Sequence, residues 1–404
     1  MRRDCGAGAP STHLSDVAND PLARPGVTRT QLFVPESVLD DLRHRLETVR
    51  WPDHETVSDT SQGLPLARAQ RLVEHWCTRY DWRRFETTLN DLGHYRTQIE
   101  GLNLHFLHVR SPHHDATPLI LTHGWPGSFI EFLRATGPLT NPTAHGGTAA
   151  DAFHVVAPGL PGFGFSDKPT TTGWTVERIA DAWAQLMQRL GYHRYIAQGG
   201  DWGGAVTHAL AALGPDGLAG IHLNFPPFLF NPPLDGIASV DEQRSLQQLK
   251  TFQQDGAGYH RVQSTRPQTI GYGLTDSPVG LAAWIFEKFD DWTDTARHPE
   301  HVIPLDIMLD NIMLYWLSRS AASSARLYWQ NESLDLSRAP QVPVGISAFP
   351  AEIVRIPRVW AQRAYSGLIY FNDVARGGHF AAFEQPGLFA GELRAFARRL
   401  AEAL

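Results

Sequence analysis

The sequence contains little cysteine and no long run of apolar residues. Its two cysteines, Cys5 and Cys77, form no CxxC pair and are too few for a disulfide framework, which excludes a disulfide-stapled secreted domain. No stretch reaches the roughly 20 apolar residues that span a bilayer, and none follows the N-terminal arginines as in a signal peptide. We therefore expect a soluble, cytoplasmic protein with no membrane partner.

The sequence also lacks a strong excess of one sign of charge. The chain has 35 basic and 42 acidic residues, a net charge of −7, and the two signs are interspersed without a basic stripe. This pattern argues against a nucleic-acid partner. The metal-binding patterns HExxH and CxxC are absent, and no G-x-G-x-x-G dinucleotide motif follows the first strand. We expect that the protein needs neither a metal nor an organic cofactor.

The N-terminal part of the chain contains helical patterns and one hairpin signal. The first 27 residues are rich in Gly, Ala, Pro and Ser, which predicts a flexible leader. Apolar residues at helical spacing predict three helices between residues 34 and 92. Two strands are expected around Glu100–Gly101, where the apolar period changes from helical to alternating.

From PLILTHG at residue 118 onwards, short apolar strands alternate with helices. This alternation predicts an α/β domain with a mostly parallel sheet and helices on both faces. Thr175 is expected to cap one of these helices, which stops at Gly191. Near Pro226 the alternation gives way to several helices without strands, the pattern of a lid inserted into the sheet domain. The predicted organisation is a leader (1–27), an N-terminal region (28–115), the first part of the core (116–225), a helical lid (226–335) and the second part of the core (336–404).

The stretch AQGGDWGGAV places Asp201 in the turn between a predicted strand and a predicted helix. Its core has the pattern G-x-D-x-G, which is the nucleophile-elbow pattern G-x-S-x-G with aspartate in place of serine. Open α/β sheets bind ligands at such turns, and a carboxylate can form an ester with a substrate. Asp is also a common helix N-cap, so this motif alone leaves cap and nucleophile both open.

An elbow nucleophile requires an oxyanion site, an acid and a histidine, in that fold's chain order of nucleophile, acid, histidine. The HGWPG turn follows an earlier strand, so the backbone N–H groups of Trp125 and Trp202 are the expected oxyanion donors. His379 follows the last predicted strand between glycines and is the candidate base. Glu352 follows the preceding strand and is the preferred acid; the weaker candidates for this role are Asp306, Asp310 and Asp373.

With these parts in place, the chain resembles the epoxide hydrolases of the α/β-hydrolase superfamily, and within them the microsomal-type branch. The resemblance runs from about residue 30 to the end. It rests on DLRHRLETVRWPD at 41–53, HGWPGS at 123–128, PGLPGFGFSDKP at 158–169, GGDWG at 199–203, STRPQTIGYGLTDSPVGLAAWIFEKF at 264–289 and GGHFAAFEQP at 377–386. The sequence departs from the mammalian members in lacking their membrane anchor, so a microsomal location is not carried over.

The resemblance implies residue roles and partners. Asp201 would be the nucleophile, Glu352 the acid and His379 the base, while Tyr259 and Tyr328 would be the two lid tyrosines that protonate the epoxide oxygen. The partners would be an epoxide and water. The oligomeric state stays open, with a homodimer as one option. Aromatic residues in and near the lid suggest an apolar substrate: Phe225, Phe228, Phe230, Trp284 and Trp329. Detoxifying and biosynthetic roles both stay open.

Two other functions remain to be separated from this one. A haloalkane dehalogenase shares the fold and the aspartate nucleophile, and the indole of Trp202 could bind halide there. Such an enzyme has no use for two tyrosines, because a halide leaves without protonation. A non-catalytic binding protein of the same fold is the alternative from another class, and the full set of catalytic parts argues against it.

Overall fold

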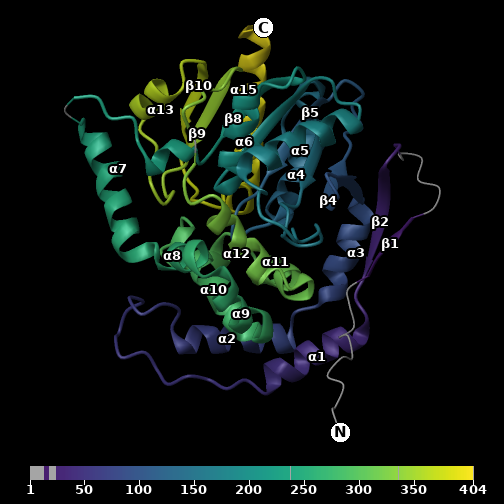
Figure 1. Cartoon of the computed structure of the whole chain (residues 1–404), viewed down its shortest axis with the longest axis vertical. Helices are drawn as coiled ribbons and strands as arrows, with labels where there is room; N and C mark the ends of the chain where they lie inside the picture. The colour runs from purple at the N-terminus through teal and green to yellow at the C-terminus, as the bar shows by residue number, and fades with distance from the viewer. Residues whose placement is uncertain (1–12, 18–23, 237, 335, 404) are drawn as a thin grey trace.

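A single ten-stranded sheet runs through the computed structural model, which describes residues 13–17, 24–236, 238–334 and 336–403 (Figure 1). The strand order is β1-β2-β3-β4-β6-β5-β7-β8-β9-β10. In this order, neighbouring strands are antiparallel from β1 as far as the β4–β6 pair. From the β6–β5 pair to the β9–β10 pair they are parallel. The strands are β1 (His13–Asp16), β2 (Val27–Phe33), β3 (His94–Ile99), β4 (Leu102–Val109), β5 (Thr117–Thr122), β6 (Phe153–Pro158), β7 (Tyr195–Gly199), β8 (Leu218–Leu223), β9 (Val344–Ala348) and β10 (Leu368–Asp373).

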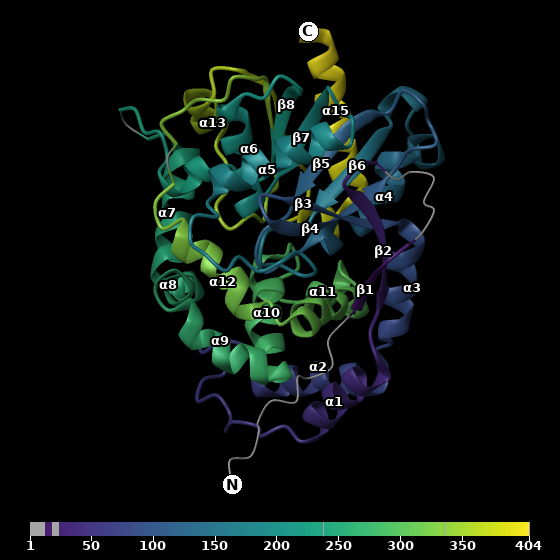
Figure 2. The same ribbon diagram turned by 45° about the vertical axis from the view of Figure 1, so that its right-hand side comes forward.

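Helices cover both faces of the parallel part of the sheet, as the alternation of strands and helices predicts. On one face α5 (Val176–Arg189) and α6 (Trp202–Leu213) pack together over β5, β7 and β8. On the other, α4 (Leu133–Thr140) and α15 (Pro386–Ala403) pack together against β6, β8 and β10 (Figure 2). β5 to β9 are rich in Val, Ile and Leu and largely buried, as expected for strands covered on both faces. The fold is an α/β-hydrolase fold.

The N-terminal region contains two strands that the sequence analysis missed. β1 lies within the predicted flexible leader and pairs with β2, which in turn pairs with β3. β2 reads VTRTQLF, and its mixture of Thr, Arg and Gln conceals the alternation of a half-buried strand. The rest of the predicted leader, residues 1–12 and 18–23, lies outside the described residues.

Three predicted N-terminal helices are present as α1 (Glu36–Glu47), α2 (Leu66–Thr78) and α3 (Trp82–Leu92). α1 and α2 pack against α10 (Pro278–Trp292), so the N-terminal region reaches around to the helical segment between β8 and β9 (Figure 1). That segment contains α7 (Val240–Thr251), α8 (Gly258–Thr265), α9 (Pro267–Asp276), α10, α11 (Leu305–Ser318) and α12 (Ala321–Gln330). The short helices α13 (Arg358–Ala364) and α14 (Ala381–Glu384) follow β9 and β10.

The cap of α5 differs from the prediction. Thr175 does occupy the N-cap position, but its side chain makes no capping hydrogen bond. Instead, the N–H of Val176 donates to Oδ1 of Asn331, which follows α12. Because Asn331 comes from the helical segment, this bond ties the end of α12 to the core, a long-range contact that local sequence does not reveal.

Candidate active site

Asp201 lies in a strained turn between β7 and α6. Its backbone has φ 52° and ψ −131°, values that cost free energy for a residue with a side chain. The neighbouring glycines permit this turn, because a Cβ on Gly199 would overlap the carbonyl of Gly203, and one on Gly203 would overlap the carbonyl of Thr122. The Asp201 side chain makes no capping bond to α6. The turn therefore holds a carboxylate that is not used as a helix cap.

Two groups hold the Asp201 carboxylate from different sides. The backbone N–H of Trp125, in the HGWPG turn after β5, donates to Oδ1 over 2.8 Å. Nε2 of His379 lies 3.5 Å from Oδ2. The second predicted oxyanion donor, the N–H of Trp202, makes no hydrogen bond to Asp201 among the described residues. One oxygen is thus fixed by a backbone donor, and the other is left facing the imidazole.

His379 is held between the carboxylates of Asp201 and Glu352. Its Nδ1 lies 2.6 Å from Oε1 of Glu352, and both side chains are buried. Burial lowers the pKa of His379, but the negative charges of Glu352 and Asp201 outweigh burial and hold that pKa well above its usual value. The backbone is fixed as well, because the N–H of His379 donates to the carbonyl of Trp292 at the end of α10. The ring is therefore oriented so that Nε2 can accept a proton from a group bound near Asp201.

Two phenols from the helical segment face the same carboxylate. The ring of Tyr259, in α8, stacks on Trp125 with centroids 4.9 Å apart. The ring of Tyr328, in α12, meets Trp202 edge-to-face at 4.9 Å. Burial, followed by the charge of Asp201, raises the pKa of Tyr259 above its usual value. Burial also raises the pKa of Tyr328, so both phenols keep their protons near neutral pH and can donate them.

Asp201 lines two cavities. The larger one is bounded by the helical segment and includes Tyr259, Tyr328 and several apolar side chains: Trp202, Phe225, Phe230, Phe252, Leu334 and Leu336. The smaller one, of about 20 Å³, is lined by Asp201, His379, Glu131 and Gln198 among others. The larger cavity suits an apolar ligand, and the smaller one has room for about one water molecule.

The weaker candidates for the acid are engaged elsewhere. Asp310 accepts hydrogen bonds from Tyr80 and Arg84, and Asp306 pairs with His75. Asp373 pairs with Arg355. None of these three aspartates contacts His379, and this leaves Glu352 as the carboxylate on its Nδ1.

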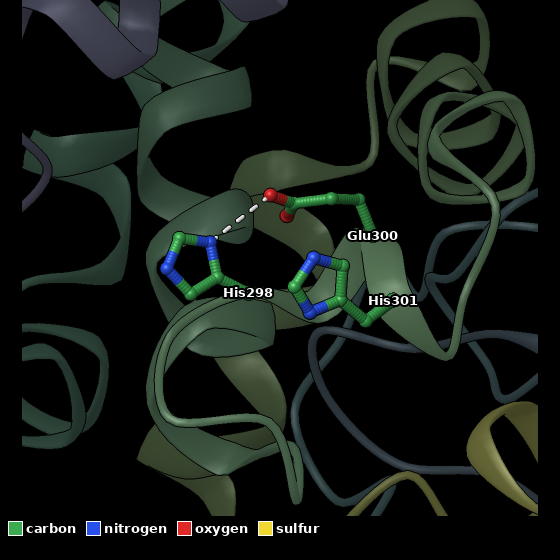
Figure 3. Close-up of side chains that lie close together, drawn as sticks. All are labelled: His298, Glu300 and His301. Carbon is green, nitrogen blue, oxygen red and sulfur yellow. Dashed lines mark hydrogen bonds and ion pairs between the residues drawn. The ribbon is translucent and has the colours of Figure 1, made fainter.

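The only group of side chains that could hold a metal ion, among the described residues, lies on the surface. Figure 3 shows its members, His298, Glu300 and His301, which are all exposed. Glu300 is 3.5 Å from the guanidinium of Arg68, whose positive charge competes with a cation for that carboxylate. The cluster contributes no residue to either cavity beside Asp201.

Sequence reasoning missed residues that support the site. Glu384 accepts hydrogen bonds from the N–H groups of Gly378 and Phe380, on either side of His379, and of Asp294 after α10. Glu131 lines the smaller cavity. The sequence offers one sign of their importance, a carboxylate within a strongly apolar stretch. Glu131 lies in SFIEF and Glu384 in HFAAFE.

The fold and this arrangement of aspartate, histidine and glutamate define an α/β-hydrolase. Comparisons with known proteins agree: residues 117–265 match the family described as alpha/beta hydrolase fold, and residues 27–132 match the one described as epoxide hydrolase N terminus. Epoxide hydrolase 1 of Sus scrofa is 35% identical and aligns over 93% of this chain and 91% of its own. A protein of Stigmatella aurantiaca with a provisional description as an epoxide hydrolase is 59% identical, over 93% of this chain and 86% of its own.

Solved structures give the same result. The epoxide hydrolase of Aspergillus niger superposes with a TM-score of 0.82 at 33% identity, covering 92% of this chain and 96% of its own. The juvenile hormone epoxide hydrolase of Bombyx mori gives 0.84 at 29% identity, covering 93% and 95%. The chain therefore belongs to the epoxide hydrolase family and is an enzyme of that family. No helix in the described ranges is both long and apolar enough to cross a bilayer.

Proposed function

We propose that the enzyme converts an apolar epoxide to a vicinal diol through a covalent ester on Asp201. The observation that carries this proposal is the position of the Asp201 carboxylate. It lies between a backbone donor and the imidazole of His379, at the floor of a cavity that also presents two protonated phenols. A nucleophile, a base and two acids around one cavity are what epoxide opening followed by ester hydrolysis requires.

In the first step, Oδ2 of Asp201 attacks a ring carbon of the epoxide. Oδ1 stays on the N–H of Trp125 and becomes the carbonyl oxygen of the ester. The breaking C–O bond places negative charge on the epoxide oxygen, which takes a proton from Tyr259 or Tyr328. Both phenols are buried, so little water competes for that hydrogen bond.

In the second step, a water molecule gives a proton to Nε2 of His379 and attacks Cγ of Asp201. The ester no longer carries the negative charge of Asp201, one of the two charges that raise the pKa of His379. The imidazole is therefore easier to use as a neutral base at this stage. Glu352 fixes the ring and stabilises the imidazolium that forms. The N–H groups of Trp125 and Trp202 stabilise the oxyanion, where one such donor is worth about 2.7–4 kcal/mol.

The larger cavity supports an apolar substrate. Phe225 and Phe230, two of the aromatic residues suggested by the sequence, line this cavity, whereas Phe228, Trp284 and Trp329 are not among its lining residues. We propose that the helices of residues 226–335 act as the lid that supplies these walls. All catalytic side chains come from one chain, so the activity does not require a homodimer. We also place the enzyme in the cytoplasm, where the exposed thiol of Cys77 stays reduced.

A comparison of two substrates tests the proposed reaction against dehalogenation. Purified enzyme is incubated with styrene oxide and, separately, with 1-chlorobutane, and diol and chloride are both measured. We expect diol from styrene oxide and no chloride from 1-chlorobutane. Asp201→Ala should remain folded and form no diol. Chloride release without any diol formation, or wild-type diol formation by Asp201→Ala, would contradict the proposal.

A further inference from the structure

A second carboxyl group lies beside the nucleophile and has no part in the mechanism above. Glu131 belongs to a short 3₁₀ helix, Phe129–Phe132, that follows the HGWPG turn. Its side chain lines the smaller cavity together with Asp201 and His379. Structural carboxylates in proteins are usually buried against their donors, and Glu384 in this protein accepts three backbone N–H groups. Glu131 instead faces a cavity at the reacting atoms.

The backbone makes room for this carboxyl group. A Cβ on Gly127 would overlap Oε1 of Glu131, so any residue larger than glycine at position 127 would push the carboxyl group out of its place. Glycine is thus needed here for space and not for an unusual backbone angle. The absence of a side chain at Gly127 therefore fixes where the carboxyl group of Glu131 can lie.

The cavity is polar and of the right size for one water molecule. Gln198, in β7, is 1% exposed, and its Nε2 donates to Oδ1 of Asn224 over 2.7 Å. Its Oε1 has no hydrogen-bond partner within the described part of the chain. A buried acceptor without a partner is costly unless it contacts water. Because a buried water typically makes about three hydrogen bonds, the polar side chains of Glu131, Gln198 and His379 provide a suitable set.

The charge of Glu131 responds to the chemical step. Burial raises the pKa of Glu131 to about 8; His379 lowers it, and the negative charge of Asp201 raises it. Esterification removes the charge of Asp201, and proton transfer to His379 adds a positive charge nearby. Both changes favour the carboxylate form of Glu131 during ester hydrolysis, when an acceptor for a water O–H is useful.

We propose that Glu131 is a further catalytic residue, which binds the hydrolytic water in the smaller cavity and orients it for attack on Cγ of Asp201. This inference rests on the proposed function. In the step, the water oxygen bonds to Cγ and one water proton passes to Nε2 of His379. The other O–H, directed by Glu131, stays on the oxygen. The Cγ–O bond to the substrate then breaks, and the substrate oxygen takes the proton from His379. The remaining proton restores the tyrosine that protonated the epoxide.

The test separates the two half-reactions by stopped-flow and quenched-flow mixing of enzyme with styrene oxide. Glu131→Gln keeps the size of the side chain and removes its charge. We expect the alkylation rate constant to stay within about threefold of the wild type, while ester hydrolysis slows about 10- to 100-fold because the water is misplaced. The ester should then accumulate and be visible as added substrate mass on the intact protein. Gly127→Ala should slow the same step, since it displaces the same carboxyl group.

Glu392→Gln is the matched control. Glu392 is a partly buried carboxylate in α15 that binds Ser347, Tyr370 and Asn372, and we expect wild-type kinetics from its replacement. Wild-type hydrolysis in Glu131→Gln would overturn the inference. So would a parallel loss of alkylation and hydrolysis together with a lower Tm, because that marks a structural role. If the wild-type enzyme itself forms no ester, the proposed function fails instead.

Discussion

Replacement of Glu352 by glutamine should separate the two chemical steps of the enzyme. The Glu352 carboxylate is fully buried, and its Oε1 lies 2.6 Å from Nδ1 of His379. Two unit charges about 4 Å apart interact by about 4 kcal/mol at an effective dielectric constant of 20. Glutamine keeps the shape and one hydrogen-bond acceptor but loses this charge. The remaining hydrogen bond preserves part of the interaction, so the loss should be at most about 4 kcal/mol. At 1.4 kcal/mol for each factor of ten, ester hydrolysis should slow by about 10²- to 10³-fold.

Alkylation should change far less, since in the proposed mechanism Asp201 attacks the epoxide without help from a base. We expect its rate constant in Glu352→Gln to stay within about fivefold of the wild type. The intrinsic fluorescence of tryptophan is a suitable signal, because Trp292 lies 5.0 Å from the His379 ring and Trp125 donates to Asp201. Stopped-flow traces should show a normal fast phase followed by a very slow recovery. A loss of the fast phase with normal recovery would refute the role given to Glu352.

Three further predictions concern the phenols, the elbow and a distant ion pair. Tyr328→Phe should slow alkylation about 10- to 100-fold with little effect on ester hydrolysis in single-turnover experiments, because only ring opening needs the proton. Gly203→Ala should lower the free energy of unfolding by about 1–3 kcal/mol in denaturant titrations, since its Cβ meets the Thr122 carbonyl. Arg398 holds the pKa of Asp151 down to about 2, so that carboxylate stabilises the fold above its unfolded pKa and less as the pH falls through the folded value. Asp151→Asn should cost about 1–2 kcal/mol at pH 7 in urea titrations, after allowance for the exposed Arg398, and the difference should narrow as the pH falls from about 5 to about 1.

The sequence predicted the α/β core well because its signals are local. Strands such as PLILT and FHVVAP are short, apolar and bounded by glycine turns, and they appear as β5 and β6. β1 and β2 have weak sequence signals because the edge strand β1 is only four residues long and β2 mixes polar with apolar residues. The sequence predicts that Thr175 caps α5, whereas the capping acceptor is the side chain of Asn331, which is distant in sequence.

The candidate catalytic residues also differ in how far local sequence signals reveal them. Asp201, Glu352 and His379 could be proposed from their positions at strand ends and their chain order, and the structure brings their side chains within hydrogen-bond or ion-pair distance. Tyr259 and Tyr328 have no local signal, and only the family resemblance pointed to them. Glu131 was not noticed, since its importance depends on a glycine, a cavity and an aspartate that meet only in three dimensions.

A single-turnover reaction in ¹⁸O-labelled water shows directly whether an ester forms on Asp201. Enzyme is used in excess over styrene oxide, and in the proposed mechanism water attacks Cγ of Asp201 and not the substrate carbon. We expect the first diol to contain no label and the ¹⁸O to be found in the Asp201 carboxylate, which mass spectrometry of the peptide containing GGDWGG detects. Label in the diol after one turnover, with an unlabelled Asp201, would contradict the covalent mechanism.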